Sequence, residues 1–99
     1  MATLQEITDR FKAAVGDDSG LGKTLKFDLK GDGLIYIDGG SVTNDDNPAD
    51  CTITVSQDDL ELLGEGKLDP TMAFMQGKIK IAGDMSIAMK LQGLMSKMR

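Results

Sequence analysis

Residues 72–91 read Met72-Ala-Phe-Met-Gln-Gly-Lys-Ile-Lys-Ile-Ala-Gly-Asp-Met-Ser-Ile-Ala-Met-Lys-Leu91. This pattern predicts a short helix that begins at the preceding Asp69-Pro70 pair and ends at Gly77, an alternating strand over 78–82, and a second helix that Asp84 caps. Six of the seven methionines lie at or beyond Met72. Methionine side chains are flexible and suit surfaces that adapt to varied apolar partners. The segment therefore favours a protein that binds apolar molecules over an enzyme with a rigid active site.

The preceding sequence predicts two further helices and three further strands. Thr3 followed by Glu6 is a capping box, which opens a helix that ends at Gly16. A second helix is expected from Ser56 to Gly64. Segments that alternate apolar and polar residues predict half-buried strands over 25–29, 34–38 and 51–55, the first two as a hairpin. Because each strand has one apolar face, we expect an α+β fold with helices on one side of the sheet.

The net charge of −5 conceals an asymmetry along the chain. Residues 1–66 hold 5 basic and 14 acidic side chains, whereas residues 67–99 hold 6 basic and 2 acidic ones. Two interpretations stay open: the lysine-rich end is simply solvated, or it makes transient contact with an anionic membrane surface. The overall acidity and the aromatic content of 4% argue against nucleic acid, because phosphate binding needs cations and base stacking needs aromatic rings.

The residue inventory argues against catalysis and metal binding. The chain has no histidine, which is the most frequent general base and zinc ligand. The single cysteine, Cys51, cannot form an internal disulfide, which is typical of a reducing compartment. No apolar run approaches the roughly 20 residues that span a bilayer, and the first residues show no signal-peptide pattern. We therefore expect a non-catalytic, cytoplasmic single domain over residues 1–99, without cofactor or metal.

Residues 66–91 carry a family resemblance. They read Gly66-Lys-Leu-Asp-Pro-Thr-Met-Ala-Phe-Met-Gln-Gly-Lys-Ile-Lys-Ile-Ala-Gly-Asp-Met85 and continue through Ala88-Met-Lys-Leu91. This segment resembles the signature region of the sterol carrier protein type-2 lipid-transfer domain. The resemblance implies a mainly antiparallel five-stranded sheet, covered on one face by helices, with an apolar tunnel between the layers. A fifth, short strand is then expected in residues 39–50.

The resemblance also implies which side chains face the lipid. By position, the motif of the family falls on Phe74, Met75, Ile79, Ile81, Met85, Ala88, Met89 and Leu91. Our candidate lipid-binding set adds Phe27, Ile35, Ile53, Val55 and Met95. Core packing is the alternative for each of them, since apolar residues at regular spacing are mostly ordinary core. The many methionines of the last helix favour a cavity there, because flexible side chains specify a packed core poorly.

Two functions fit these observations. The first is a non-catalytic intracellular lipid carrier, monomeric, which holds a long-chain ligand (a fatty acid, fatty acyl-CoA, phospholipid or sterol) in an apolar tunnel. Acyl chains are the first expectation for its ligand. The second is a protein-interaction module that docks through its methionine-rich face to a lipid-metabolising enzyme. A carrier buries that face around a lipid tail, whereas a docking module exposes it.

Overall fold

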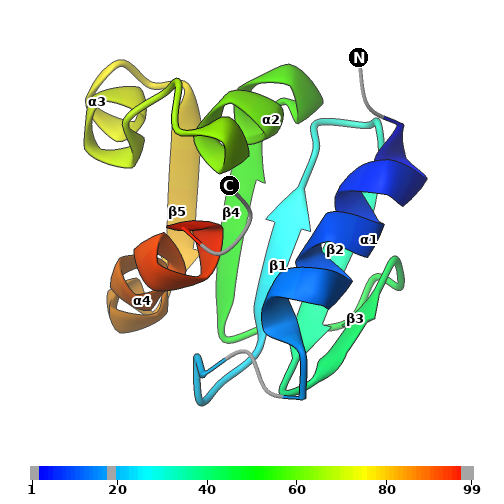
Figure 1. Cartoon of the computed structure of the whole chain (residues 1–99). Helices are drawn as coiled ribbons and strands as arrows, with labels where there is room; N and C mark the ends of the chain where they lie inside the picture. Colours follow the sequence, from blue (N-terminus) through cyan, green and yellow to red (C-terminus); the bar gives the residue numbers. More distant parts are fainter. Residues whose placement is uncertain (1–2, 18–19, 97–99) are drawn as a thin grey trace.

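The computed structural model describes residues 3–17 and 20–96, and within these the chain forms four helices and five strands (Figure 1). Their order is α1 (Leu4–Val15), β1 (Leu25–Asp28), β2 (Leu34–Asp38), β3 (Ser41–Thr43), β4 (Cys51–Val55), α2 (Gln57–Glu65), α3 (Pro70–Met75), β5 (Ile79–Gly83) and α4 (Met85–Ser96). The alternation of short strands with separate helices confirms the predicted α+β class.

The five strands form one sheet in the order β3-β2-β1-β4-β5. The pairs β1–β2, β2–β3 and β4–β5 are antiparallel, and β1–β4 is parallel. The mainly antiparallel five-stranded sheet is therefore confirmed. Its fifth strand is β3, which has three residues, forms one edge of the sheet and lies in the segment where a short strand was expected.

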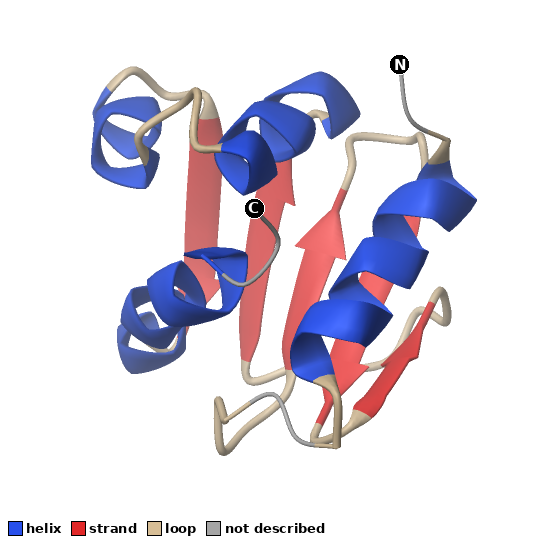
Figure 2. Cartoon of the chain, in the orientation of Figure 1, coloured by secondary structure: helices blue, strands red, loops and turns tan. Residues whose placement is uncertain are grey.

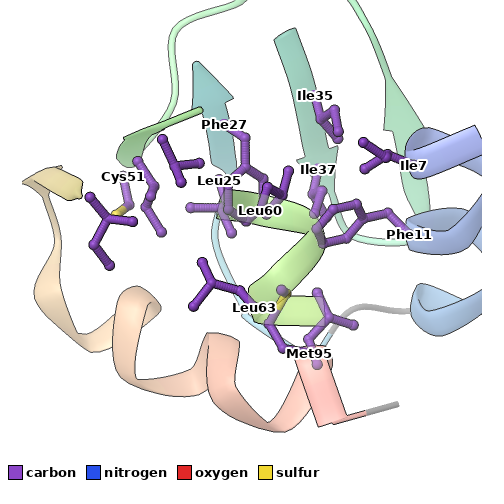
Figure 3. Packing of buried hydrophobic residues seen from close by; sticks show 14 of the residues in the cluster. Ile7, Phe11, Leu25, Phe27, Ile35, Ile37, Cys51, Leu60, Leu63 and Met95 are labelled. Atoms are coloured by element: carbon purple, nitrogen blue, oxygen red, sulfur yellow. The ribbon is translucent and has the colours of Figure 1, made fainter. Parts of the chain in front are cut away.

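The helices cover one face of the sheet, and the core lies beneath them (Figure 2). Residues of β1 and β4 that point toward the helices are buried, while the residues between them are only partly so. Helix α1 packs over the β3 side of the sheet, where Ile7 and Phe11 face Ile35 and Ile37 of β2 (Figure 3). The Phe11 ring lies 5.1 Å from the ring of Phe27, centroid to centroid. Alternation of buried and half-exposed residues thus places the fully buried apolar side chains of the sheet on its helix-covered face, whereas Leu34 and Tyr36 of β2 lie on the other face.

Capping residues fix the helix boundaries. The Thr3 hydroxyl accepts a hydrogen bond from the Glu6 amide at 3.2 Å, which begins α1 as predicted. The predicted end of the second helix at Gly64 was wrong. Helix α2 continues to Glu65 and ends at Gly66, which has a positive φ of 78° and donates its amide to the Leu62 and Leu63 carbonyls. Glycine adopts this left-handed conformation without steric cost, and Gly64 is buried inside the helix instead.

Asp84 fixes the corner between β5 and α4. Its carboxylate accepts hydrogen bonds from the Ser86 amide at 2.9 Å and from Lys23 Nζ at 2.8 Å. The bond from Lys23, followed by the bonds from the hydroxyl and the amide of Ser86, lowers the pKa of Asp84 well below its ordinary value. Gly83, with a φ of 106°, lies so close to the Asp50 carbonyl that a Cβ atom there would collide with it. The cap predicted at Asp84 is confirmed, and it sets the position of the helix that carries more of the candidate site than any other element.

Candidate functional site

A pocket of about 410 Å³ lies between the β4–β5 side of the sheet and the helices α2, α3 and α4. Its volume falls in the range of roughly 300–1,000 Å³ that is usual for small-molecule sites. The side chains around it are almost all apolar. They are Phe27, Ile53, Leu63, Pro70, Thr71, Phe74, Ile79, Ile81, Met85, Ala88, Met89, Leu91 and Met95.

The floor of the pocket is a row of side chains that crosses three neighbouring strands. Phe27 of β1 is the register partner of Ile53 in β4, which in turn pairs with Ile81 in β5. Residues at matching register positions point to the same face of a sheet, so these three side chains stand side by side under α4. Ile79, two residues before Ile81 on the same strand, extends the floor toward α3.

Side chains of α4 form one wall of the pocket and side chains of α3 form another. Figure 1 shows both helices next to β5. On α4, Met85 and Met89 are one turn apart and share a face, so that both reach the pocket. On α3, Pro70 and Phe74 are related in the same way. Ile87 faces the core on another side of α4 and is buried. The helix is therefore apolar toward the core and toward the pocket.

The pocket opens to solvent between α3 and α4. Phe74 is 48% exposed, Met85 50% and Met89 77%, although all three line the cavity. The floor residues Phe27 and Ile53 are buried. The site is thus deep on the sheet side and open on the helix side. An enclosed tunnel stays a prediction.

The structure brings together most of the predicted lipid-binding residues, because all of them except Ile35, Val55 and Met75 line the pocket. Ile35 belongs to the same cross-strand row as Phe27, but it lies under α1. Val55 is fully buried in the core at the end of β4. Met75 is 75% exposed on α3 and does not line the cavity. Contact of the pocket residues with a lipid stays a prediction.

Three residues of the lining were not predicted: Leu63, Pro70 and Thr71. Pro70 and Thr71 lie one turn before Phe74 on α3, so helical spacing from that residue would have indicated them. Leu63 carries no such signal, because its spacing from Leu60 is the same as that of an ordinary core residue.

The chemistry of the lining is that of an apolar receptor. Thr71 is the only polar side chain on it, and no titratable group belongs to it among the residues that the structure describes. Cys51 is buried beside β5 rather than at the pocket, and burial raises the pKa of its thiol, so the thiol is neutral at pH 7. The pocket can bind hydrocarbon through desolvation and close contact.

Metal binding and membrane spanning find no support in the described part of the chain. Residues 3–17 and 20–96 contain no cluster of three or more histidine, cysteine, aspartate or glutamate side chains placed to hold an ion. The helices found in these ranges are too short or too polar to cross a bilayer.

The sequence of residues 4–96 matches the SCP-2 sterol transfer family. The fold and the apolar pocket define a lipid-binding α+β domain, and the chain belongs to that family. The match covers every helix and strand described above, including the pocket. The family resemblance of the segment around Phe74 is thereby confirmed.

Known proteins of the family share sequence and fold with this chain. Sterol carrier protein 2 of Rattus norvegicus is 59% identical over 56 residues, which cover 56% of this chain and 10% of that protein. Hydroxysteroid dehydrogenase-like protein 2 of Danio rerio is 42% identical over 82 residues, which cover 75% of this chain and 20% of that protein. The chain thus matches only a tenth to a fifth of the length of these relatives.

Similar solved structures include one that carries a fatty acid. The solution structure of palmitated SCP2L2 from Aedes aegypti superposes with a TM-score of 0.74 at 25% sequence identity. The superposition covers 96% of this chain and 96% of that chain. The fold of this chain is therefore shared, over nearly its whole length, by a protein whose structure was solved with palmitate.

Proposed function

We propose that the chain is a non-catalytic intracellular lipid carrier that acts as a monomer and binds one long acyl chain in the pocket between β5, α3 and α4. The observation that carries this proposal is the apolar lining of a 410 Å³ cavity in a protein of this family. The palmitated relative from Aedes aegypti supports the same class of ligand.

The pocket is large enough to supply useful affinity. Each buried methylene contributes about 0.8 kcal/mol, so about ten methylenes contribute roughly 8 kcal/mol. That free energy corresponds to a dissociation constant of about 1 μM before the cost of ordering the ligand. A carrier needs affinity of this order, since it must both hold and release its ligand.

The lining selects for the tail of a lipid rather than for its headgroup. No cationic side chain belongs to the lining among the described residues, so a carboxylate or phosphate inside the cavity would lose its hydration without a partner. The opening between Phe74 and Met89 leaves room for a headgroup to stay in water. Fatty acids, fatty acyl-CoA and single-tailed phospholipids therefore fit this geometry alike. Among the ligands that we considered, an acyl chain suits the elongated floor of isoleucine and phenylalanine side chains.

Bound fatty acid should raise the thermal stability of the protein. At a free concentration 100 times the dissociation constant, a ligand that binds only the folded state adds about 2.7 kcal/mol to the free energy of unfolding. For a domain of this size, that change raises the melting temperature by roughly 10 °C or more. Differential scanning fluorimetry of the protein stripped of lipid, with and without palmitate below its critical micelle concentration, measures this rise.

A series of shorter fatty acids provides the control for that measurement. Each additional pair of methylenes should raise the affinity roughly tenfold until the pocket is full. Butyrate, which carries the same carboxylate, should leave the melting temperature unchanged. A melting temperature that is equally insensitive to butyrate, laurate, palmitate and palmitoyl-CoA would contradict the proposal of an acyl-chain carrier.

The observation that favours the alternative function, a protein-docking module, is the exposure of the methionines. Met75 and Met89 are among the most exposed apolar side chains of the described residues, as a protein-binding face requires. The two functions differ in how a hydrophobic dye such as ANS responds to lipid. Stoichiometric displacement of the dye by palmitate supports the carrier, whereas dye binding that palmitate does not affect supports the docking module.

A further inference from the structure

The exposure of the lining side chains falls steadily from one end of the pocket to the other. On α4, Met89 is 77% exposed, whereas Met95, farther along the same helix, is only 4% exposed. On the floor, Ile81 of the edge strand β5 is half-buried, whereas Phe27 of β1 is fully buried. In Figure 1 the beginning of α4 lies beside β5, and its end, drawn in red, lies toward the middle of the sheet. The pocket is therefore open on the side of β5 and closed on the side of β1.

Two side chains from different helices close the inner end of the pocket. They are Leu63 of α2 and Met95 of α4, which are 6% and 4% exposed and both line the cavity. The two helices are in contact, and both side chains belong to the buried cluster that also contains Phe27 (Figure 3). We call Leu63 and Met95 the end wall.

Packed core lies beyond the end wall. The cross-strand row of the floor continues from Phe27 to Ile35 of β2, but α1 covers that position. The Phe11 ring of α1 packs 5.1 Å from the ring of Phe27, and α1 also contacts α4. Protein interiors are close-packed, so they accept additional atoms only when buried side chains are displaced. A chain that reaches the end wall therefore has no free space ahead of it.

A fatty acid should enter this pocket tail first. Its carboxylate keeps its hydration when it stays at the opening between Phe74 and Met89, and it would lose that hydration inside the apolar cavity. The last methyl group of the tail then lies nearest to the end wall. The distance from the opening to the end wall thus determines how much of the chain can be buried.

We propose that Leu63 and Met95 set the length of acyl chain that the protein can bury, and so select among fatty acids. This proposal deepens the carrier function and rests on it. A cavity of about 410 Å³ holds roughly 10–14 chain carbons, if each carbon takes about the volume of a water molecule in the liquid, ~30 Å³. Affinity should rise with chain length up to that limit and then level off, because further carbons remain in water at the opening. We call the chain length at which the rise ends the plateau length.

Substitutions at Leu63 test the end wall in both directions. Leu63→Ala removes about three carbon atoms from the end wall, so it should lengthen the plateau by about three carbons. Leu63→Phe adds about three carbon atoms and should shorten the plateau by as much. Three methylenes correspond to roughly a 50-fold change in affinity. The ratio of the affinity for palmitate to that for octanoate should therefore fall roughly 50-fold in Leu63→Phe. Displacement of a fluorescent fatty acid by saturated fatty acids from octanoate to stearate measures these quantities.

Met95→Ala tests the same wall from the other helix. It enlarges the inner end of the pocket from α4 instead of α2, and it should also lengthen the plateau by about three carbons. This variant keeps the test decisive if Leu63→Ala does not fold.

Leu60→Ala is the matched control for Leu63→Ala. Leu60 lies one turn earlier on α2 and is 1% exposed, but it does not line the pocket. The control should lower the melting temperature about as much as Leu63→Ala does and should leave the plateau length unchanged. An equal shift of the plateau in both variants would overturn the proposal, since a loosened core alone would then account for it.

The same titrations separate this proposal from the carrier function. Fatty acid binding with one plateau length in the original chain, Leu63→Ala, Leu63→Phe and Met95→Ala would overturn the end wall and leave the carrier intact. Failure of the original chain to bind any fatty acid of the series would overturn the carrier, and the end wall with it.

Discussion

Replacement of Ala88 by tryptophan should lower the affinity for palmitate roughly 100-fold. Ala88 lies on α4 and lines the pocket between Met85 and Met89. An indole ring at this position would occupy space that the acyl chain needs, and exclusion of three or four methylenes costs about 3 kcal/mol. Because the ring fills a cavity that is open to solvent, the packed core beneath it should remain intact. Isothermal titration calorimetry with palmitate measures the loss.

Ala13→Trp is the matched control for this variant. Ala13 is exposed on α1, far from the pocket, and the substitution makes the same change in the helix propensity of an alanine position. The natural chain contains no tryptophan, so each variant also carries a single fluorescent reporter. Palmitate should bind the Ala13→Trp protein with the original affinity. Unchanged palmitate affinity in the Ala88→Trp protein would exclude this pocket as the acyl-chain site.

Replacement of Phe27 by alanine should lower the free energy of unfolding by about 3–5 kcal/mol. Phe27 is fully buried, contacts the Phe11 ring and stands at the β1 end of the pocket floor, on a strand that lies between β2 and β4. Its truncation removes contacts and leaves a cavity that the surrounding strands cannot close. Since small domains are stable by only about 5–15 kcal/mol, this variant should be close to unfolding at 37 °C. Urea denaturation followed by circular dichroism measures the change.

Phe74→Ala makes the same chemical change on the opposite side of the same pocket. Phe74 is 48% exposed at the mouth, so its truncation should cost less than about 1 kcal/mol of stability. It should nevertheless weaken palmitate binding, because the ring lines the cavity. The two phenylalanines therefore separate a structural role from a ligand-binding role. Equal losses of stability in the two variants would contradict the distinction between floor and mouth.

The sequence was sufficient to predict the elements that carry strong local signals. Alternation over residues 34–38 and 51–55 identified two strands, and the Asp69-Pro70 pair marked the beginning of α3. Asp69 indeed accepts a hydrogen bond from the Thr71 amide at 2.9 Å. These features can be predicted locally, because a helix cap and the alternation of a strand each depend on only a few neighbouring residues.

Local patterns were not sufficient where the outcome depends on tertiary neighbours. Ile35 and Phe27 are register partners with the same alternation, yet α1 covers one and the pocket lies above the other. The spacing of residues in the sequence shows which of them lie on the same face of a strand. It does not show which helix packs over each of those residues. Strand β3 has only three residues, which is too few to show a period.

The methionines show the same limit. The family resemblance grouped Met75 with Met85 and Met89 as residues that face the lipid. In the structure Met85 and Met89 line the pocket and Met75 does not. The six residues of α3 point in several directions around the helix axis. The position of α3 beside β5 determines which of them face the cavity.

The central claim is that an acyl chain occupies the pocket between the floor of the sheet and α4. NMR spectroscopy of protein labelled with carbon-13 at the methionine methyl groups tests it most directly, because methionines lie both in the pocket and outside it. Addition of palmitate should shift the methyl signals of Met85, Met89 and Met95 and should give nuclear Overhauser contacts from them to the acyl chain. The signal of Met75 should move little. Palmitate contacts confined to Met72 and Met75, or no contact with any methionine at saturating palmitate, would contradict the account.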